Sequence, residues 1–145
     1  MNPNTLLAQL KKAKNQVPSL VREELENSNL ERLNINNLQQ GKDSDGNDMP
    51  RYLDPDYANF KLMMNPSNRG FWDLRLSGEY YRGIKANIYG TQIFFRQTIT
   101  NKKIEWIHSK IGLRGLGITD KQLYEVQLKN KPKIKRRLEN IINNV

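Results

Sequence analysis

The sequence contains no cysteine and only one histidine, His108, among its 145 residues. Without cysteine, the chain forms no disulfide, holds no zinc through thiolates and offers no cysteine nucleophile. No stretch approaches the run of about 18 apolar residues that a membrane-spanning helix needs. The first residues also lack the apolar core of a signal peptide. The sequence therefore predicts a protein without a membrane partner.

Apolar residues are also few, at 37% of the chain, whereas 27% are charged. The length fits one domain with its own core, so we expect a single domain over residues 1–145. The low apolar content fits either a large wet surface or a surface that partner chains cover. The net charge of +9 is uneven, because residues 1–50 carry 6 basic and 7 acidic groups and residues 51–145 carry 18 and 8. Nucleic acid, an acidic protein face and plain solubility all explain such a basic second part.

The spacing of apolar residues predicts an α+β fold. Apolar residues recur at helical spacing from Leu6 to Leu25, and Pro18 is expected to break or kink this segment. Residues 27–40 fit neither period clearly. The predicted order is an N-terminal helical region (1–40), an extended but ordered arm (41–70), an antiparallel β-hairpin or small-sheet region (71–100) and a C-terminal helical region (101–145).

Alternation of apolar and polar residues predicts the hairpin. The strands are expected over 81–90 and 92–100, joined at Gly90-Thr91. The C-terminal region then reads as three short helices. Gly112 is expected to end the first of them, and Pro132 to start the last.

The stretch "GKDSDGNDMPRY" (residues 41–52) raises the question of a metal site, since aspartates and an asparagine surround Gly46. A calcium loop that began at Asp43 would need glycine at its sixth position and glutamate at its twelfth. Asp48 and Asp54 stand there instead. We therefore interpret the stretch as a tight turn whose side chains bond their own backbone, and we predict no metal.

Other patterns typical of enzymes are weak. His108 stands alone on a predicted helix face, and nothing in the sequence places a serine and a carboxylate beside it. The glycines of "GLRGLG" (112–117) match neither a phosphate loop nor a dinucleotide fingerprint. We expect no catalytic residue, no cofactor and no enzyme activity. A small metal-dependent nuclease that uses Asp54, Asp56 and Asp73 is an alternative.

A basic run surrounds Pro132, with six positive residues within nine positions. A solvated helix face is the ordinary explanation, and contact with a DNA backbone or an acidic partner is the functional one. On a helix after Pro132, we expect Lys133, Arg136 and Arg137 to share one face. That face would lie opposite Ile134, Leu138 and Ile141. The run comprises Lys129, Lys131, Lys133, Lys135, Arg136 and Arg137.

Two stretches, "LQQGKDSDGNDMPRYLDPDYANFK" and "FWDLRLSGEYYRGIKANI", resemble a known family in their order and spacing. They are similar to the small virion-assembly proteins of tailed bacteriophages, which are called neck, head–tail joining, tail-completion or minor capsid proteins. The stretch "IGLRGLGITDKQLYEV" also looks like a helix start found in such phages, although the inserted "RGLG" departs from its spacing. The matching residues are Gly41, Asp45, Gly46, Tyr52, Tyr57 and Lys61 in the first stretch and Asp73, Leu74, Leu76, Ser77 and Gly78 in the second.

The resemblance implies a non-catalytic α+β protein that forms part of an oligomeric ring around the DNA channel at the head–tail junction. The implied partners are further copies of the chain, portal, adaptor or tail proteins, and genomic DNA through non-specific contacts. The implied location is the neck or tail of the virion, assembled in the host bacterial cytoplasm, and the Asn, Ile and Lys bias would suit a short-tailed crAss-like phage. A basic nucleic-acid-binding accessory protein is the alternative. The arm residues expected to anchor the interface are Tyr52, Tyr57, Phe60, Met63, Met64, Phe71 and Trp72.

Overall fold

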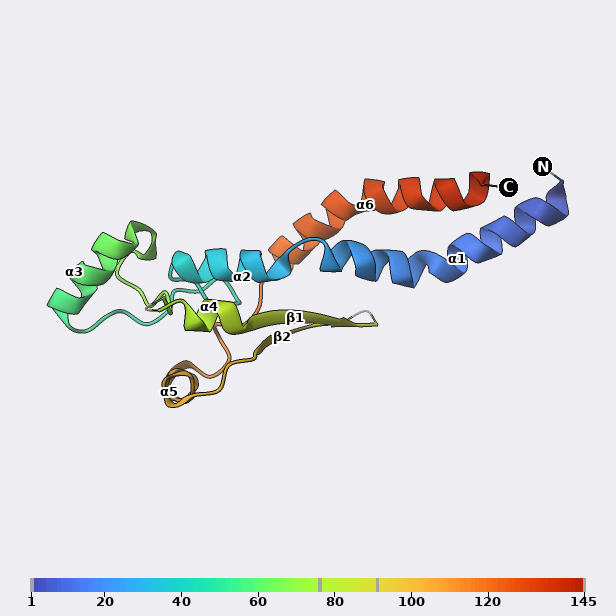
Figure 1. Cartoon of the computed structure of the whole chain (residues 1–145). Coiled ribbons are helices and arrows are strands. Elements are labelled where there is room, and N and C mark those ends of the chain that lie inside the picture. Colours follow the sequence, from blue (N-terminus) through green and yellow to red (C-terminus); the bar gives the residue numbers. More distant parts are fainter. Residues whose placement is uncertain (1, 76, 91, 145) are drawn as a thin grey trace. The chain divides into compact units, whose positions relative to one another are not determined.

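The computed structural model describes residues 2–75, 77–90 and 92–144, so Leu76 and Thr91 lie outside the described residues. The fold is α+β, as the sequence predicts, with a two-stranded antiparallel sheet among helices (Figure 1). The elements are α1 (Pro3–Glu26), α2 (Leu30–Gln39), α3 (Pro55–Met64), the 3-10 helix η1 (Pro66–Asn68), α4 (Glu79–Gly83), β1 (Ile84–Tyr89), β2 (Gln92–Gln97), α5 (Lys102–Ile111) and α6 (Asp120–Asn143).

The chain divides into two compact units. Unit 1 comprises Met1–Asn29, Ile88–Gln92 and Lys121–Val145, and unit 2 comprises Leu30–Asn87 and Ile93–Asp120. Unit 1 has 11 basic and 5 acidic residues, so it carries +6 of the net charge of +9. The positive charge is therefore concentrated in the unit that contains both long helices.

The two long helices of unit 1 are α1 and α6, and each runs uninterrupted through a proline. α1 contains Pro18 and α6 contains Pro132, so the predicted helix start at Pro132 is wrong. Of the break or kink predicted at Pro18, the break is wrong, and the kink stays a prediction. A proline inside a helix removes one N–H donor and crowds the preceding turn, at a cost of about 3 kcal/mol. Helix-forming residues on both sides of each proline and packing within the unit offset that cost.

Polar contacts fasten α6 to the C-terminal part of α1. The buried side chain of Asn130 donates from Nδ2 to Oγ of Ser28 at 2.9 Å. Seven residues further along α6, Arg137 pairs with Glu24 at 3.2 Å and also with Glu23. Apolar contacts within the unit come from Ala13, Leu20 and Leu25 of α1, which are buried.

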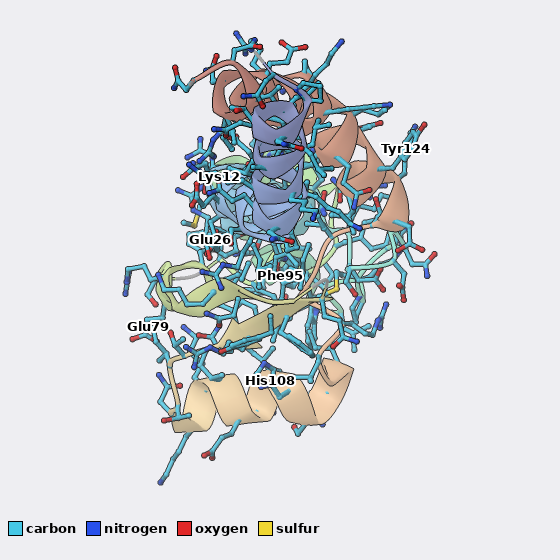
Figure 2. The ribbon with its side chains drawn as sticks, turned by 90° about the vertical axis from the view of Figure 1, so that its right-hand side faces the viewer. Lys12, Glu26, Glu79, Phe95, His108 and Tyr124 are labelled. Atoms are coloured by element: carbon cyan, nitrogen blue, oxygen red, sulfur yellow. The ribbon has the colours of Figure 1, made fainter. Side chains whose placement is uncertain are left out.

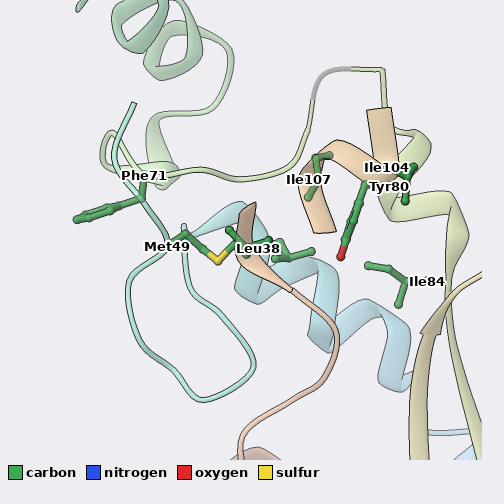
Figure 3. Close-up of a cluster of buried hydrophobic side chains, with 8 residues drawn as sticks. Leu38, Met49, Phe71, Tyr80, Ile84, Ile104 and Ile107 are labelled. Atoms are coloured by element: carbon green, nitrogen blue, oxygen red, sulfur yellow. The ribbon is translucent and has the colours of Figure 1, made fainter. Parts of the chain in front are cut away.

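The core of unit 2 lies between α2, α4, β1 and α5 (Figure 3). α5 contributes the stripe that the sequence predicts, with Ile104, Ile107 and Ile111 all buried. The helix begins after Asn101, whose side chain accepts from the N–H of Ile104 at 2.9 Å, and it ends at Gly112, as predicted. The remaining members of the cluster are Leu38, Met49, Phe71, Tyr80 and Ile84.

The hairpin is present but shorter than predicted. Its first strand begins at Ile84, because Tyr81–Gly83 belong to α4, and its second ends at Gln97. The chain is closely packed at this boundary. A Cβ at Gly83 would lie 1.4 Å from Oε1 of Gln97, and Thr98 donates from its backbone N–H to the Gly83 carbonyl at 2.7 Å.

The arm over residues 41–70 is ordered, but it is not extended, because it contains α3 and η1. The sequence "DPDY" starts α3. Asp54 caps it by accepting from the backbone N–H groups of Asp56 and Tyr57 at 2.9 and 3.3 Å, and Pro55 occupies the first turn. The expectation of an extended segment missed this capping signal.

We expect Arg137→Gln to lower the melting temperature, because the change removes a side chain that bonds two glutamates of α1. The matched control is Lys133→Gln with Arg136→Gln, since both side chains are exposed. Thermal unfolding followed by circular dichroism, at low and high salt, measures both variants. The difference in melting temperature between Arg137→Gln and the unaltered protein should be smaller at high salt, because salt screens the ion pairs. Equal melting temperatures for the Arg137 variant and the unaltered protein would contradict the assignment.

Candidate interaction groove

An ion pair between Lys61 of α3 and Asp73 lies inside unit 2. Nζ of Lys61 is 2.7 Å from Oδ1 of Asp73, and the two side chains expose only 2% and 0% of their surface. Lys61 also donates to the carbonyl of Arg75. Taking both charges out of water is costly, so such a pair is stable only where further hydrogen bonds satisfy it.

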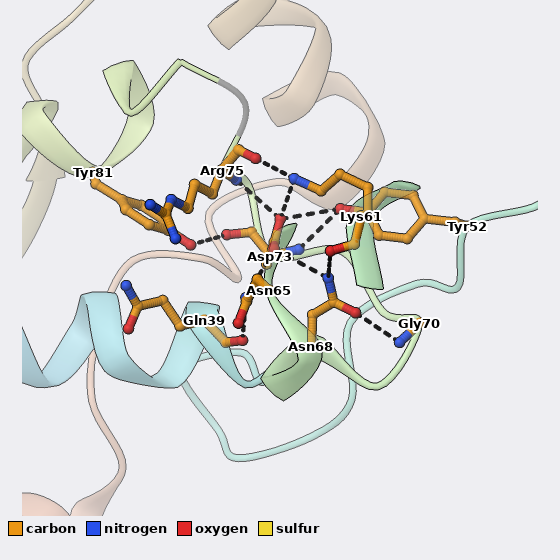
Figure 4. A network of polar contacts seen from close by, with 9 residues as sticks. All are labelled: Gln39, Tyr52, Lys61, Asn65, Asn68, Gly70, Asp73, Arg75 and Tyr81. Atoms are coloured by element: carbon orange, nitrogen blue, oxygen red, sulfur yellow. Dashed lines mark hydrogen bonds and ion pairs between the residues drawn. The ribbon is translucent and has the colours of Figure 1, made fainter. Parts of the chain in front are cut away.

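Neighbouring donors satisfy the Asp73 carboxylate fully (Figure 4). Oδ1 also accepts from the Tyr52 hydroxyl and from the backbone N–H of Arg75, each at 3.1 Å. Oδ2 accepts from the side chains of Asn65 and Asn68 at 3.0 and 3.2 Å. With these four bonds and the lysine, the carboxylate has the partners that a buried charge requires.

The same network ties α3 to the rest of unit 2. Asn65 also donates to the carbonyl of Gln39, the last residue of α2, at 2.8 Å. Asn68 donates to the Lys61 carbonyl at 3.3 Å and accepts from the N–H of Gly70 at 2.8 Å. The polar cluster therefore positions α3, whose only fully buried residue is Lys61.

The cluster holds fixed protonation states. Burial raises the pKa of the Asp73 carboxyl, but hydrogen bonds from Lys61, Asn65, Asn68 and the Arg75 backbone outweigh it and bring the pKa below its ordinary value. Burial is also the main cause that raises the pKa of the Tyr52 and Tyr81 hydroxyls. Because none of these three pKa values moves toward neutral pH, the cluster is suited to support rather than to proton transfer.

The residues of the first matching stretch form a turn and a close approach. Oδ1 of Asp43 accepts from the N–H groups of Asp45 and Asn47, both at 2.9 Å, which confirms the tight turn. Oδ2 of Asp43 pairs with Arg114 at 3.1 Å. Gly41 has a φ of 68°, and a Cβ there would lie 2.7 Å from Cβ of Phe71, so only glycine fits.

The residues of the second matching stretch connect the ion pair to α4. After Asp73, Leu74 adopts a left-handed backbone with φ of 55°. Ser77 is exposed, and Gly78, with φ of 80°, is the residue at which α4 begins. The positive φ angles of Leu74 and Gly78 turn the chain between Asp73 and α4.

A groove of about 710 Å³ opens in unit 2 between the arm, residues 72–75 and 77–80, and α5. That volume is within the range of roughly 300–1,000 Å³ found for ligand-binding sites. Trp72 and Trp106 stack in its wall with ring centroids 5.8 Å apart. The apolar and aromatic lining residues are Pro50, Tyr52, Leu53, Tyr57, Trp72, Leu74, Tyr80, Ile104, Trp106 and Ile107.

The charged residues of the groove are mostly basic. Lys61 is neutralised by Asp73, which leaves four positive side chains against one negative side chain, Glu79. Glu79 accepts a hydrogen bond from Asn101 at 3.3 Å. The positive side chains are Arg51, Arg75, Lys103 and Lys110, and all four are exposed.

α3 extends the apolar surface beyond the groove. Its only buried residue is Lys61, whereas Phe60, Met63 and Met64 are 47%, 84% and 45% exposed. This is the reverse of an ordinary amphipathic helix, in which apolar residues face the core. Tyr57 belongs both to the groove and to this surface, and its ring lies 5.3 Å from that of Tyr52 and 6.1 Å from that of Phe60.

One of the residues expected at an interface, Phe71, lies in the core instead, and a second, Trp72, is only partly exposed. Phe71 is a member of the buried core and is 8% exposed, because it packs against the tight approach at Gly41. Trp72 is half-buried in the groove wall. Phe71 is therefore not an exposed anchor, while the other five residues of that set are exposed or half-exposed.

Sequence reasoning missed the contribution of α5. Lys103, Trp106 and Lys110 follow one another at i, i+3 and i+7, which places them on one helix face. Nζ of Lys110 lies 5.9 Å from the centroid of the Trp106 ring. The available signal was a tryptophan between two lysines at helical spacing, outside the stripe of Ile104, Ile107 and Ile111.

The residues considered for catalysis make structural contacts instead. Asp54 caps α3, and Asp73 is bonded to Lys61. Among the described residues there is no group of three or more histidine, cysteine or acidic side chains placed to hold a metal ion. His108 lies on the face of α5 turned toward the hairpin (Figure 2), and its Nε2 is 3.2 Å from the Tyr80 hydroxyl. These contacts pack the side chains and bring no acid–base set together.

The basic run on α6 is split by its contacts. Arg137 is half-buried against Glu23 and Glu24, so the expectation that it faces outward with Lys133 and Arg136 is wrong. The remaining members are exposed, namely Lys129, Lys131, Lys133, Lys135 and Arg136. Ile134, Leu138 and Ile141 are half-buried, as expected for the opposite face.

Comparison with known proteins gave no match to any family, curated protein or solved structure. Within the part of the chain that the structure describes, no helix is long and apolar enough to cross a membrane.

We expect Asp73→Asn to lower the free energy of unfolding by about 3–5 kcal/mol at pH 7, because it leaves the Lys61 charge buried without its partner. The lowered pKa of Asp73 means that the ionised carboxyl stabilises the fold above the ordinary carboxyl pKa, and that this contribution is lost as the pH falls through the lowered value. As the pH is lowered from 7 to below about 4, the free energy of unfolding should therefore fall less for the variant than for the unaltered protein. Urea unfolding at several pH values measures this, with Asp45→Asn, an exposed turn carboxyl, as the control. Parallel pH profiles for the protein and the Asp73 variant would contradict the role of the pair.

We expect millimolar calcium to leave the melting temperature unchanged. The Asp43 carboxylate already accepts two backbone N–H groups and pairs with Arg114, so its oxygens are engaged within the turn. Differential scanning calorimetry with calcium and with a chelator measures this. A rise in melting temperature that saturates with calcium would show a metal site in the 41–52 stretch.

Proposed function

We propose that the chain is a non-catalytic structural protein of a tailed bacteriophage virion, and that it forms part of an oligomeric ring at the head–tail junction. The observation that carries the proposal is the inverted helix α3, which buries its lysine and exposes Phe60, Met63 and Met64. Exposed apolar patches of this kind mark protein–protein interfaces. The phage assignment rests on the resemblance of the two sequence stretches.

The geometry of unit 2 supports an assembly role in a second way. The matching residues Gly41 and Asp73 fix the position of α3 through a close approach and a buried ion pair. A rigidly held apolar helix loses little conformational freedom when a partner covers it, which favours tight association. The resemblance and the exposed surface are therefore connected through the same residues.

A basic nucleic-acid-binding accessory protein is the second candidate. The observation that favours it is the exposed basic series on α6, in the unit that carries +6 of the net charge. Binding through such charges falls steeply with salt and does not discriminate between sequences. DNA binding by the purified protein that persists in physiological salt, without self-association, would favour this candidate over the ring subunit.

We expect Phe60→Asp together with Met63→Asp to prevent assembly while preserving the fold, because both side chains are exposed and the ion pair beneath them is untouched. Mass spectrometry of particles made from a phage genome that carries the altered gene measures incorporation. Sedimentation of the purified variant measures self-association, and Leu113→Asp, which changes a 65% exposed leucine of the same unit, is the control. Normal incorporation of the double variant into particles would show that α3 is not part of the interface. Absence of the unaltered protein from purified virions would refute the virion assignment itself.

A further inference from the structure

We infer that the groove of unit 2 binds a segment of a different protein in which apolar or aromatic side chains are interspersed with acidic residues. The inference rests on the proposed function, which supplies partner proteins, and it specifies the chemistry of the contact. Its basis is the combination of an apolar floor, a positive rim and an apolar helix that continues the surface outward.

The floor of the groove favours large apolar side chains. Ile104 and Ile107 are buried beneath it, and the stacked pair of Trp72 and Trp106 forms a flat wall. The rings of Tyr52, Tyr57 and Phe60 follow one another at 5.3 and 6.1 Å from the groove toward the exposed residues of α3. The apolar surface is thus longer than the groove, which fits a peptide segment better than a compact small molecule.

The rim adds a preference for negative charge. Lys103 and Lys110 belong to α5, Arg51 to the arm and Arg75 to the segment before α4, whereas Glu79 is the one acidic residue among those that line the groove. A positive rim around an apolar centre attracts acidic partners and disfavours basic ones. The apolar floor alone would bind acidic and basic segments with equal affinity. The positive rim therefore gives the acidic segments the higher affinity.

Charge also argues against a second copy of this chain as the occupant. The exposed apolar residues of α1 are Leu6, Leu7 and Leu10, and Lys11, Lys12 and Lys14 follow them directly. Such a basic segment would meet a positive rim. A second copy as a whole also carries a net charge of +9, so we take the occupant to be a different chain, even where copies of this protein form a ring through other surfaces.

Single-stranded nucleic acid also combines flat rings with negative charge, but the arrangement of the tryptophans disfavours it. The two tryptophan rings stack on each other, so each has only one face left for a base. A peptide does not depend on such stacking, because its side chains adapt to the shape of the groove.

Fluorescence provides a direct test, since the only two tryptophans of the chain, Trp72 and Trp106, both line the groove. The probes are a short synthetic peptide of Leu, Phe, Asp and Glu, the matched peptide with Lys in place of every acidic residue, a peptide of residues 2–17 of this chain, and oligothymidylate. We expect the acidic peptide to shift the tryptophan emission and to bind roughly tenfold more tightly than the Lys peptide at low salt. The preference should narrow as salt rises.

Variants separate the rim from the overall charge. Lys103→Gln with Lys110→Gln should weaken the acidic peptide roughly tenfold, and circular dichroism should show an unchanged fold because both lysines are exposed. Lys129→Gln with Lys131→Gln removes the same charge from α6 and should leave that affinity unchanged.

Equal binding of the acidic and Lys peptides, tighter binding of the 2–17 peptide or of oligothymidylate, or equal losses in the two double variants would each overturn the inference. The titration uses purified protein and does not depend on any particle. A negative virion result would therefore refute the proposed function while the groove preference stands, and a failed titration would refute the groove preference alone.

Discussion

The buried pair of Lys61 and Asp73 is the interaction on which unit 2 depends most. A lysine with 2% of its side chain exposed and an aspartate with none are tolerable only because five donors surround the carboxylate. Those donors come from the arm, from α3, from the turn after it and from residue 75. The pair therefore joins segments that are separate in sequence, and removal of either charge would leave the other unsatisfied.

The outward surface follows from this arrangement. Because α3 is attached through its lysine, its aromatic and methionine side chains are directed away from the core. An attachment that used apolar packing would have buried Phe60 and Met64 and left no such surface. The groove shares Tyr52 and Lys61 with the network, so the position of its wall is set by the same contacts. Polar support beneath and apolar surface above are consistent with a protein whose task is contact with other chains.

The sequence predicted the local features better than the long-range ones. The α+β class, the turn around Gly46, the stripe of Ile104, Ile107 and Ile111 and the stop at Gly112 all follow from spacing within a few residues. The Lys61–Asp73 pair joins residues twelve positions apart with no periodic relation, so no sequence pattern predicted this ion pair.

Tertiary contacts also overruled several local signals. Pro18 and Pro132 suggested helix boundaries, but packing within unit 1 carries both helices past them. In the sequence, Arg137 is one of six similar basic residues. In the structure it differs from the others because it pairs with Glu23 and Glu24. Trp106 was overlooked because its significance depends on Trp72, which lies 34 positions away in the chain. In each case the deciding partner was distant in sequence.

Photo-cross-linking within assembled particles tests the central claim most directly, namely that the groove contacts a different virion protein. Benzoylphenylalanine introduced in place of Trp106 would report on the groove, and the same group in place of Tyr124, 60% exposed on α6, would serve as the comparison. The account predicts a cross-link from position 106 to another virion protein, at a segment that contains apolar and acidic residues. Cross-links only to copies of this chain or to DNA, or no more product than from position 124, would contradict it.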